Sequence, residues 1–394
     1  MPGQVVRVYP ASGANTMLPL TPQNGYNPTL LFCGGQVIPD AGWGAYGGPA
    51  VNTWTYAASA DCQRITPEPT DGSSPAYVQD DDLPVGRSMG QFIGLPDGTL
   101  LLLNGAEFGT AGYSNQTGET PTLGQMPYGP SLAAGPVFQP LIYNPNAPKG
   151  SRWSNAGLSN STVPRMYHST ALLLPDGSVM VAGSNPNADV NLTTVFPTTY
   201  TAEYFYPPYF KAKTRPAPQN VPTTLSYGGN PFDITIPSSS YSGSGDDAAG
   251  NTTVWVIRPG FTTHGMNMGQ RVMQLNNTYT VQKNGTITLH TAQLPPSPNL
   301  FQPGPALLFV TINGIPSNGT FLTVGSGQIE TQPTAAVSVL PASVNSAQSS
   351  GTGNSPSSGK KNGAATSIPL FSAANGAGNI LISFGVIALT MALS

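Results

Sequence analysis

The sequence predicts an all-β protein that begins as a partial kelch-type β-propeller and continues as an immunoglobulin-like β-sandwich. Two pairs of apolar strands, in residues 87–105 and 164–183, share the turn Leu-Pro-Asp-Gly, and each pair ends on a glycine. Apolar runs around a tight glycine turn are typical of β-hairpins, and their recurrence is typical of propeller blades. No helical periodicity of apolar residues is found before the C-terminus.

The composition supports this fold class and excludes one class of partner. The 394 residues suffice for two or three domains, and the 46 glycines and 41 prolines favour short strands joined by turns. Charged residues make up only 8% of the chain, against roughly 25% in an average soluble protein. Because Lys and Arg number 14 against 17 Asp and Glu, with no basic cluster, nucleic acid is not expected as a partner.

Residues 1–214 are predicted to form the propeller region. A third strand followed by glycine occurs at residues 30–35 (LLFCGG), and Tyr143 followed by Trp153 adds another kelch-like spacing. At about 50 residues for each kelch blade, this region supplies three or four blades, which leaves sheet edges open. Residues 216–222 read as a linker.

Residues 223–326 are predicted to form the sandwich. The expected strands are the short apolar runs 232–236, 253–258, 271–275, 286–290, 306–312 and 321–324. A glycine-bearing loop, residues 259–270 (PGFTTHGMNMGQ), separates the second run from the third. Residues 327–379 are rich in Ser and Gly and are predicted to be a disordered stalk.

The two ends of the sequence were examined for targeting signals. Residues 380–394 hold an apolar run shorter than the about 17–25 residues of a membrane-spanning helix. A GPI-attachment signal is therefore favoured over a plain membrane helix, with attachment near Asn362. No signal peptide precedes the first β-pattern, so we expect the start of the natural precursor to be missing. We expect a secreted or cell-surface monomer that contacts the membrane only through this anchor.

Cys33 and Cys62 are the only cysteines. They are either inert buried thiols or a disulfide, and a single pair in a secreted chain favours the disulfide. Seven Asn-x-Ser/Thr sequons are candidate glycosylation sites, although their number is not far above chance in a chain so rich in these residues: Asn115, Asn160, Asn191, Asn251, Asn276, Asn284 and Asn318.

The sequence has three histidines, His168, His264 and His290. When the two Leu-Pro-Asp-Gly turns are aligned, Tyr167 and His168 fall opposite Ser88 and Met89, so the scaffold does not require them. Imidazole nitrogens with a phenolate oxygen suit a tetragonal Cu(II) site. Adjacent side chains of a regular strand point to opposite faces, so a shared metal ion requires an irregular backbone at Tyr167. Ordinary surface histidines are the alternative.

Several motifs together resemble the copper radical oxidases, most closely fungal glyoxal oxidases and more distantly galactose oxidases. They are VRVYPASG, LLFCGG, LPDGTLLLLNGA, RMYHST before LLLPDG, and TTH at residues 262–264. The resemblance covers residues 1–326. It implies a kelch propeller followed by an immunoglobulin-like domain, one loop of which inserts a copper-binding histidine along the propeller axis.

The resemblance also implies a site and a reaction. Tyr167 corresponds to the axial copper ligand and to the base that accepts the substrate hydroxyl proton, and His168 and His264 correspond to equatorial ligands. The family oxidises aldehydes or alcohols and reduces O2 to H2O2. Which of glyoxal, methylglyoxal, another aldehyde or an alcohol is the substrate stays open.

The family's radical cofactor, a tyrosine joined to a cysteine, lies in N-terminal blades that this sequence does not show. Cys33 and Cys62 correspond to a different cysteine pair. The sequence thus predicts an N-terminally truncated oxidase that is inactive alone. The alternative is a non-catalytic cell-wall or surface module that retains the fold.

Overall fold

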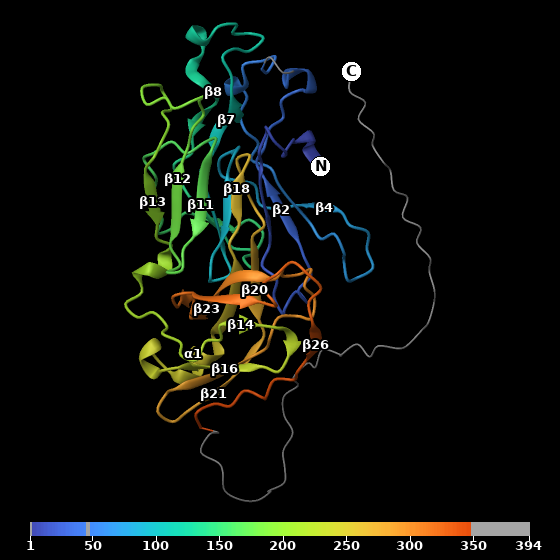
Figure 1. The fold of residues 1–394 in the computed structure, drawn as a ribbon, viewed down its shortest axis with the longest axis vertical. Coiled ribbons are helices and arrows are strands. Elements are labelled where there is room, and N and C mark those ends of the chain that lie inside the picture. The colour runs from blue at the N-terminus through green and yellow to red at the C-terminus, as the bar shows by residue number, and fades with distance from the viewer. Residues whose placement is uncertain (1, 45–47, 348–394) are drawn as a thin grey trace, which may run out of the picture. The chain divides into compact units, whose positions relative to one another are not determined.

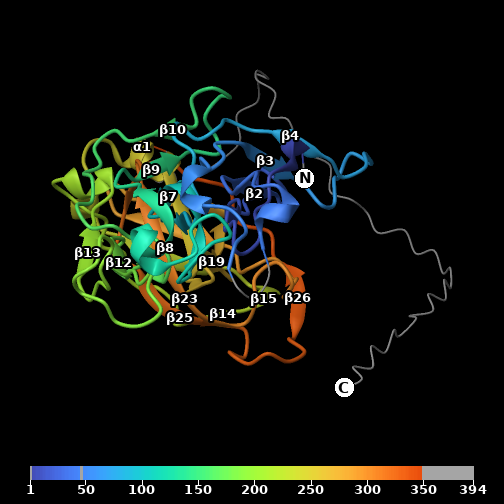
Figure 2. The same cartoon turned by 90° about the horizontal axis from the view of Figure 1, so that it is seen from above.

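The computed structural model describes residues 2–44 and 48–347, and these residues are nearly all β (Figures 1 and 2). Their one α-helix is α1 (Gly245–Gly250). The 3-10 turns are η1 (Pro2–Gln4), η2 (Asp40–Gly42), η3 (Thr53–Thr55), η4 (Leu123–Gln125), η5 (Pro208–Lys211) and η6 (Ser238–Ser240). None of the described helices is long and apolar enough to cross a membrane. Asn362 and the apolar tail lie outside the described residues.

Three antiparallel sheets of propeller type are formed by the N-terminal half. The first has the order β1-β2-β3-β4, the second β10-β9-β6-β5 and the third β11-β12-β13. Their bounds are β1 (Ala14–Met17), β2 (Leu30–Cys33), β3 (Cys62–Ile65), β4 (Tyr77–Gln79), β5 (Gln91–Gly94), β6 (Leu100–Leu103), β9 (Leu141–Tyr143), β10 (Trp153–Ser154), β11 (Ser169–Leu173), β12 (Val179–Gly183) and β13 (Ala202–Phe205). The predicted partial propeller is confirmed, with three blades in the described residues.

The repeated Leu-Pro-Asp-Gly turn closes both predicted hairpins in the same way. Gly98 and Gly177 have φ angles of 82° and 85°, which glycine adopts without strain. The carboxylate of the preceding aspartate accepts hydrogen bonds at the start of the second strand, from Thr99 after Asp97 and from Ser178 after Asp176. The repeat in the sequence is therefore a repeat of turn geometry.

A long hairpin between β6 and β9 was not predicted. It pairs β7 (Ala106–Tyr113) with β8 (Pro127–Pro136), and its register is irregular between Gly109 and Tyr113. A Cβ on Gly109 would lie 2.2 Å from the Leu132 carbonyl oxygen, so only glycine fits where the two strands approach. In Figure 1 this hairpin extends beyond the blades.

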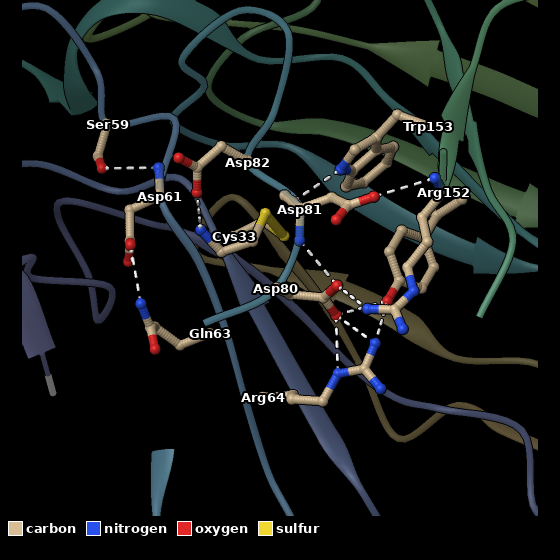
Figure 3. The surroundings of a disulfide bond; sticks show 12 residues. Cys33, Ser59, Asp61, Gln63, Arg64, Asp80, Asp81, Asp82, Arg152 and Trp153 are labelled. Atoms are coloured by element: carbon tan, nitrogen blue, oxygen red, sulfur yellow. Dashed lines mark hydrogen bonds and ion pairs between the residues drawn. A yellow bond between two sulfur atoms is a disulfide. The ribbon is translucent and has the colours of Figure 1, made fainter. Parts of the chain in front are cut away.

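Cys33 and Cys62 are joined by a disulfide. They are register partners at the end of β2 and the start of β3, and both are fully buried. Figure 3 shows the surroundings of this disulfide, with Cys33 labelled. The sheet thus holds the two sulfurs together in the first blade. No cysteine of the sequence is left free.

The C-terminal half forms a sandwich, as predicted. One sheet has the order β14-β25-β23-β17-β20 with β24 attached to β23, and a second has the order β16-β22-β21. The bounds are β14 (Thr224–Leu225), β16 (Phe232–Ile236), β17 (Thr252–Arg258), β20 (Arg271–Leu275), β21 (Asn277–Val281), β22 (Ile287–Thr291), β23 (Gly304–Ile312), β24 (Ile315–Pro316) and β25 (Thr320–Val324). Buried residues of both sheets share one core, among them Ile234, Leu289, Val254 and Val310.

The expected start of the stalk at residue 327 is too early. β26 (Thr334–Val337) pairs in parallel with β15 (Tyr227–Gly229), and Val344 forms a bridge with Thr280. Backbone hydrogen bonding to the sandwich therefore continues past residue 327. Composition concealed this, because backbone pairing does not require apolar side chains.

Candidate metal centre

Residues 259–270, expected to be a loop, contain a short β-hairpin. β18 (Phe261–Thr263) pairs with β19 (Met266–Met268), and His264 and Gly265 form the two-residue turn. Their φ angles are 54° and 77°, and two positive angles are the requirement of a type I′ turn. The turn therefore presents the His264 side chain at the tip of a hairpin that leaves the sandwich.

The hairpin docks onto the propeller through polar contacts with β5. Asn267 Nδ2 donates to the Phe92 carbonyl (2.9 Å), and the Gly94 N–H donates to Gln270 Oε1 (2.8 Å). At the tip, Ser12 Oγ donates to the His264 carbonyl at 2.8 Å. β18 also neighbours β11, and β19 neighbours β1. These contacts hold His264 against the propeller region.

Tyr167 and His168 lie in a turn that ends where β11 begins, at Ser169. His168 has a φ of 61°, so the backbone is irregular at the place where a shared site requires it. The Tyr167 and His168 rings are stacked, with centroids 3.8 Å apart. Met89, the residue of the preceding blade that aligns with His168, has a similar φ of 57°. This backbone conformation therefore recurs in both blades, and only the side chains differ at the candidate site.

One pocket of about 300 Å³ is lined by Tyr167, His168 and His264. His168 Nδ1 is 3.0 Å from the Asn185 carbonyl oxygen, and His264 Nδ1 is 2.8 Å from Thr263 Oγ1. When each Nδ1–H donates to that oxygen, Nε2 holds the lone pair that a metal ion requires. Two imidazole nitrogens and a phenol oxygen form a donor set that fits copper. The described residues hold no cluster of three or more His, Cys, Asp or Glu that would compete for the metal.

Two further tyrosines lie beside this site and were missed by the sequence analysis. The Tyr9 ring is 6.2 Å from that of Tyr167 and 5.3 Å from that of His264, and the Tyr113 ring is 6.5 Å from that of Tyr167. Burial, and then a hydrogen bond with Tyr9, raise the pKa of the Tyr167 phenol well above its usual value. Tyr9 lies within the VRVYPASG motif, but the motif does not reveal its place in the site, because the residues that Tyr9 contacts lie far along the chain.

The remaining candidates lie elsewhere. His290 is on β22, where Nδ1 is 2.7 Å from Asp233 Oδ1 and Nε2 is 3.0 Å from Thr280 Oγ1, so it belongs to the sandwich surface. Asn191 is half-buried, and the other six sequon asparagines are exposed: Asn115, Asn160, Asn251, Asn276, Asn284 and Asn318.

Gln91 is expected to hold the two halves of the site together. Its buried side chain donates to the Ser169 carbonyl (3.0 Å) on β11 and accepts from Thr262 Oγ1 (3.3 Å) on β18. Leucine removes both bonds at similar volume, and we expect Gln91→Leu to lower the free energy of unfolding by about 1–3 kcal/mol. Urea unfolding measures this, with the exposed Gln125→Leu as control. Equal midpoints for the two variants would contradict the role of Gln91.

Both halves of the chain match known protein families. Residues 1–209 match the family model for the glyoxal oxidase N-terminus, and residues 215–324 match that for the galactose oxidase-like early set domain. An aldehyde oxidase GLOX from Vitis pseudoreticulata is 34% identical over 79% of this chain and 53% of its own length. Aldehyde oxidase GLOX1 from Arabidopsis thaliana is 33% identical over 81% of this chain and 48% of its own.

A solved structure shares the fold. It is a fungal alcohol oxidase of the AA5 family in complex with copper, with a TM-score of 0.54 and 20% identity, covering 80% of this chain and 54% of the other. The chain spans about half the length of the relatives that it matches. Since the first family model covers more than half of the sequence, the chain belongs to the glyoxal oxidase family of copper radical oxidases.

Proposed function

We propose that this chain is part of a copper-dependent oxidase that acts on small aldehydes. In the overall reaction an aldehyde hydrate loses two hydrogens and becomes a carboxylic acid, and O2 gains them and becomes H2O2. The observation that carries the proposal is that Tyr167 and His168, from a propeller turn, line one pocket with His264, from the sandwich hairpin. If His168 and His264 were ordinary surface histidines, nothing would require the sandwich hairpin and the propeller turn to bring them to one pocket.

The residues of this chain have separate roles in the proposal. His168 and His264 hold the copper, and hydrogen bonds at Nδ1 orient both rings. Tyr167 supplies the phenol oxygen, which ligates the metal and accepts the substrate hydroxyl proton. When bound, copper supplies the one-electron redox chemistry that amino acid side chains lack.

The family's second redox group, the thioether-linked tyrosine, has no cysteine available in this sequence. Only two cysteines are present, and both are in the disulfide. We propose that residues 1–394 alone bind copper but do not turn over an aldehyde. A non-catalytic surface module with the same fold is the alternative, and the same pairing of both cysteines supports it.

The test separates copper binding from oxidation. Purified protein is titrated with Cu(II), oxidised by one electron and given methylglyoxal, and H2O2 is then measured. We expect one copper for each chain and no H2O2 above the metal-free control. Turnover by this chain would overturn the expected inactivity, and failure to bind copper would favour the surface module.

We further propose that the protein is a secreted or cell-surface glycoprotein monomer, GPI-anchored near Asn362. The disulfide supports secretion, since disulfides persist in oxidising compartments, and the exposed sequons would be accessible to glycosylation there. Intact mass before and after glycosidase treatment tests the glycans. A mature mass that still includes Ser394 would refute the anchor.

A further inference from the structure

A second and larger cavity adjoins the metal pocket. Its volume is about 660 Å³, within the roughly 300–1,000 Å³ of small-molecule sites. The described residues that line it carry no charge and are mostly apolar or aromatic, with Tyr9, Pro10, Trp43, Pro49, Tyr113 and Leu132 as the larger ones. Small aldehydes such as glyoxal have no apolar group that would use this volume.

Tyr9 and Tyr113 connect the cavity to the metal pocket. Both line the cavity, and both rings lie within 6.5 Å of the Tyr167 ring, centroid to centroid. Tyr9 also contacts His264 edge to face, at 5.3 Å. A molecule bound between these two tyrosines therefore has one end beside the proposed copper ligand and the other end in the cavity.

Gly112, the Tyr9 loop and Thr53 form part of the wall of this cavity. Gly112 has a φ of 112°, and a Cβ there would lie 3.4 Å from Leu132 Cδ1 and 3.7 Å from the Tyr9 hydroxyl, at the cavity wall. The Ala111 N–H donates to the Pro10 carbonyl at 2.8 Å and holds the Tyr9 loop against β7. Thr53, a polar lining residue, donates its hydroxyl to the Leu132 carbonyl at 2.6 Å. The hydroxyl of Thr53 is therefore satisfied by the protein.

We propose that this cavity binds the aromatic ring of an aryl aldehyde or aryl alcohol and directs its carbonyl or hydroxymethyl group to Tyr167. The inference rests on the proposed function, because only an oxidase site beside the cavity gives that orientation a chemical use. The described lining residues carry no charge and include three aromatic side chains. They favour an aromatic ring over a sugar or a charged acid, since ring faces and edges attract one another and these residues offer no charge to pair.

Binding is tested without turnover. The probe is benzyl alcohol, measured by ligand-observed NMR on the copper-free protein, with cyclohexylmethanol as a non-aromatic ligand of the same size. We expect benzyl alcohol to bind more tightly. Trp43→Ala should weaken its binding by about twofold to tenfold, because one aromatic pair is lost. Trp43→Phe should restore most of the affinity, and Tyr204→Ala, on the exposed face of β13, should leave it unchanged.

A second measurement serves if Trp43→Ala does not fold. In the wild-type protein, 4-nitrobenzyl alcohol should quench tryptophan fluorescence, and the quenching should fall in Trp43→Phe. Equal affinity for benzyl alcohol and cyclohexylmethanol, or quenching unchanged in Trp43→Phe, would overturn the inference. A copper titration of the same samples keeps the two proposals apart: no copper binding with aromatic binding intact rejects the oxidase alone, and the reverse result rejects the aromatic site alone.

Discussion

Replacing His264 with asparagine is expected to lower the copper affinity of the protein by more than about 100-fold. Loss of a residue that only orients a ligand costs 10–100-fold in metal affinity, so loss of a ligand should exceed that range. Asparagine tolerates the φ of 54° at this position and is favoured before glycine in a type I′ turn, so the β18–β19 hairpin should persist. His264 is exposed, and its replacement leaves the core intact.

His290→Asn is the matched control for this experiment. It removes the one histidine that lies outside the pocket, on β22, where it contacts Asp233 and Thr280. Competition titration with a Cu(II) chelator gives the affinities, and thermal unfolding shows whether each variant is folded. A similar loss of affinity in both variants, or none in His264→Asn, would remove His264 from the site.

Replacing Asp80 with alanine is expected to destabilise the protein by about 3–5 kcal/mol, the usual cost of removing one partner from a buried ion pair. The Asp80 side chain is fully buried and joins two blades (Figure 3). From its own blade it accepts from Arg64 Nε at 2.8 Å, and from the next blade it accepts from the Tyr143 hydroxyl at 2.6 Å and from Arg152. Alanine would leave two guanidinium groups without this carboxylate.

Urea unfolding measures this cost, and Asp71→Ala is the control. Asp71 is an exposed carboxylate whose contact is a local hydrogen bond from the Ser73 N–H, so its loss should cost well under half as much. Equal stability of Asp80→Ala and the wild type would show that the inter-blade pairing contributes nothing net.

The same carboxylate predicts a pH dependence. Burial by itself would raise the pKa of Asp80, but hydrogen bonds from Tyr143, Arg64 and Arg152 outweigh burial and hold the pKa below its ordinary value of 3.8. A depressed pKa stabilises the folded state above the unfolded pKa, and that stabilisation is lost as the pH falls through the folded value. The stability difference between wild type and Asp80→Ala should therefore shrink below about pH 4.

Local patterns in the sequence were enough to predict several strands of each region, although not all of them. The two Leu-Pro-Asp-Gly turns, the glycine after each second strand and the pairing of Tyr143 with Trp153 all correspond to features of the blades. The apolar runs at residues 232–236 and 271–275 coincide with β16 and β20. Turns and strands can be predicted from the sequence because each depends on only a few consecutive residues: the residue types of the turn and the alternation of apolar and polar side chains along the strand.

The candidate site was predicted through the resemblance of Tyr167, His168 and His264 to family motifs. Their spacing alone could not bring them together, because His264 lies in another domain and reaches the propeller only through a hairpin docked on β5. The β7–β8 hairpin escaped prediction because its alternation is interrupted by Gly109 and Gly112. Gly109 is needed where the two strands approach closely, and Gly112 adopts a φ of 112°.

What the sequence by itself determined is the fold class, the repeated turns and the residue types that can hold copper. What only the tertiary structure decided is their arrangement: Tyr9 beside Tyr167 and His264, and an aromatic cavity beyond them. The physical reason is the range of the interactions. Turns and strands are set by neighbouring residues, whereas a pocket is set by which side chains meet after strands from two domains have packed, and no local pattern records that packing.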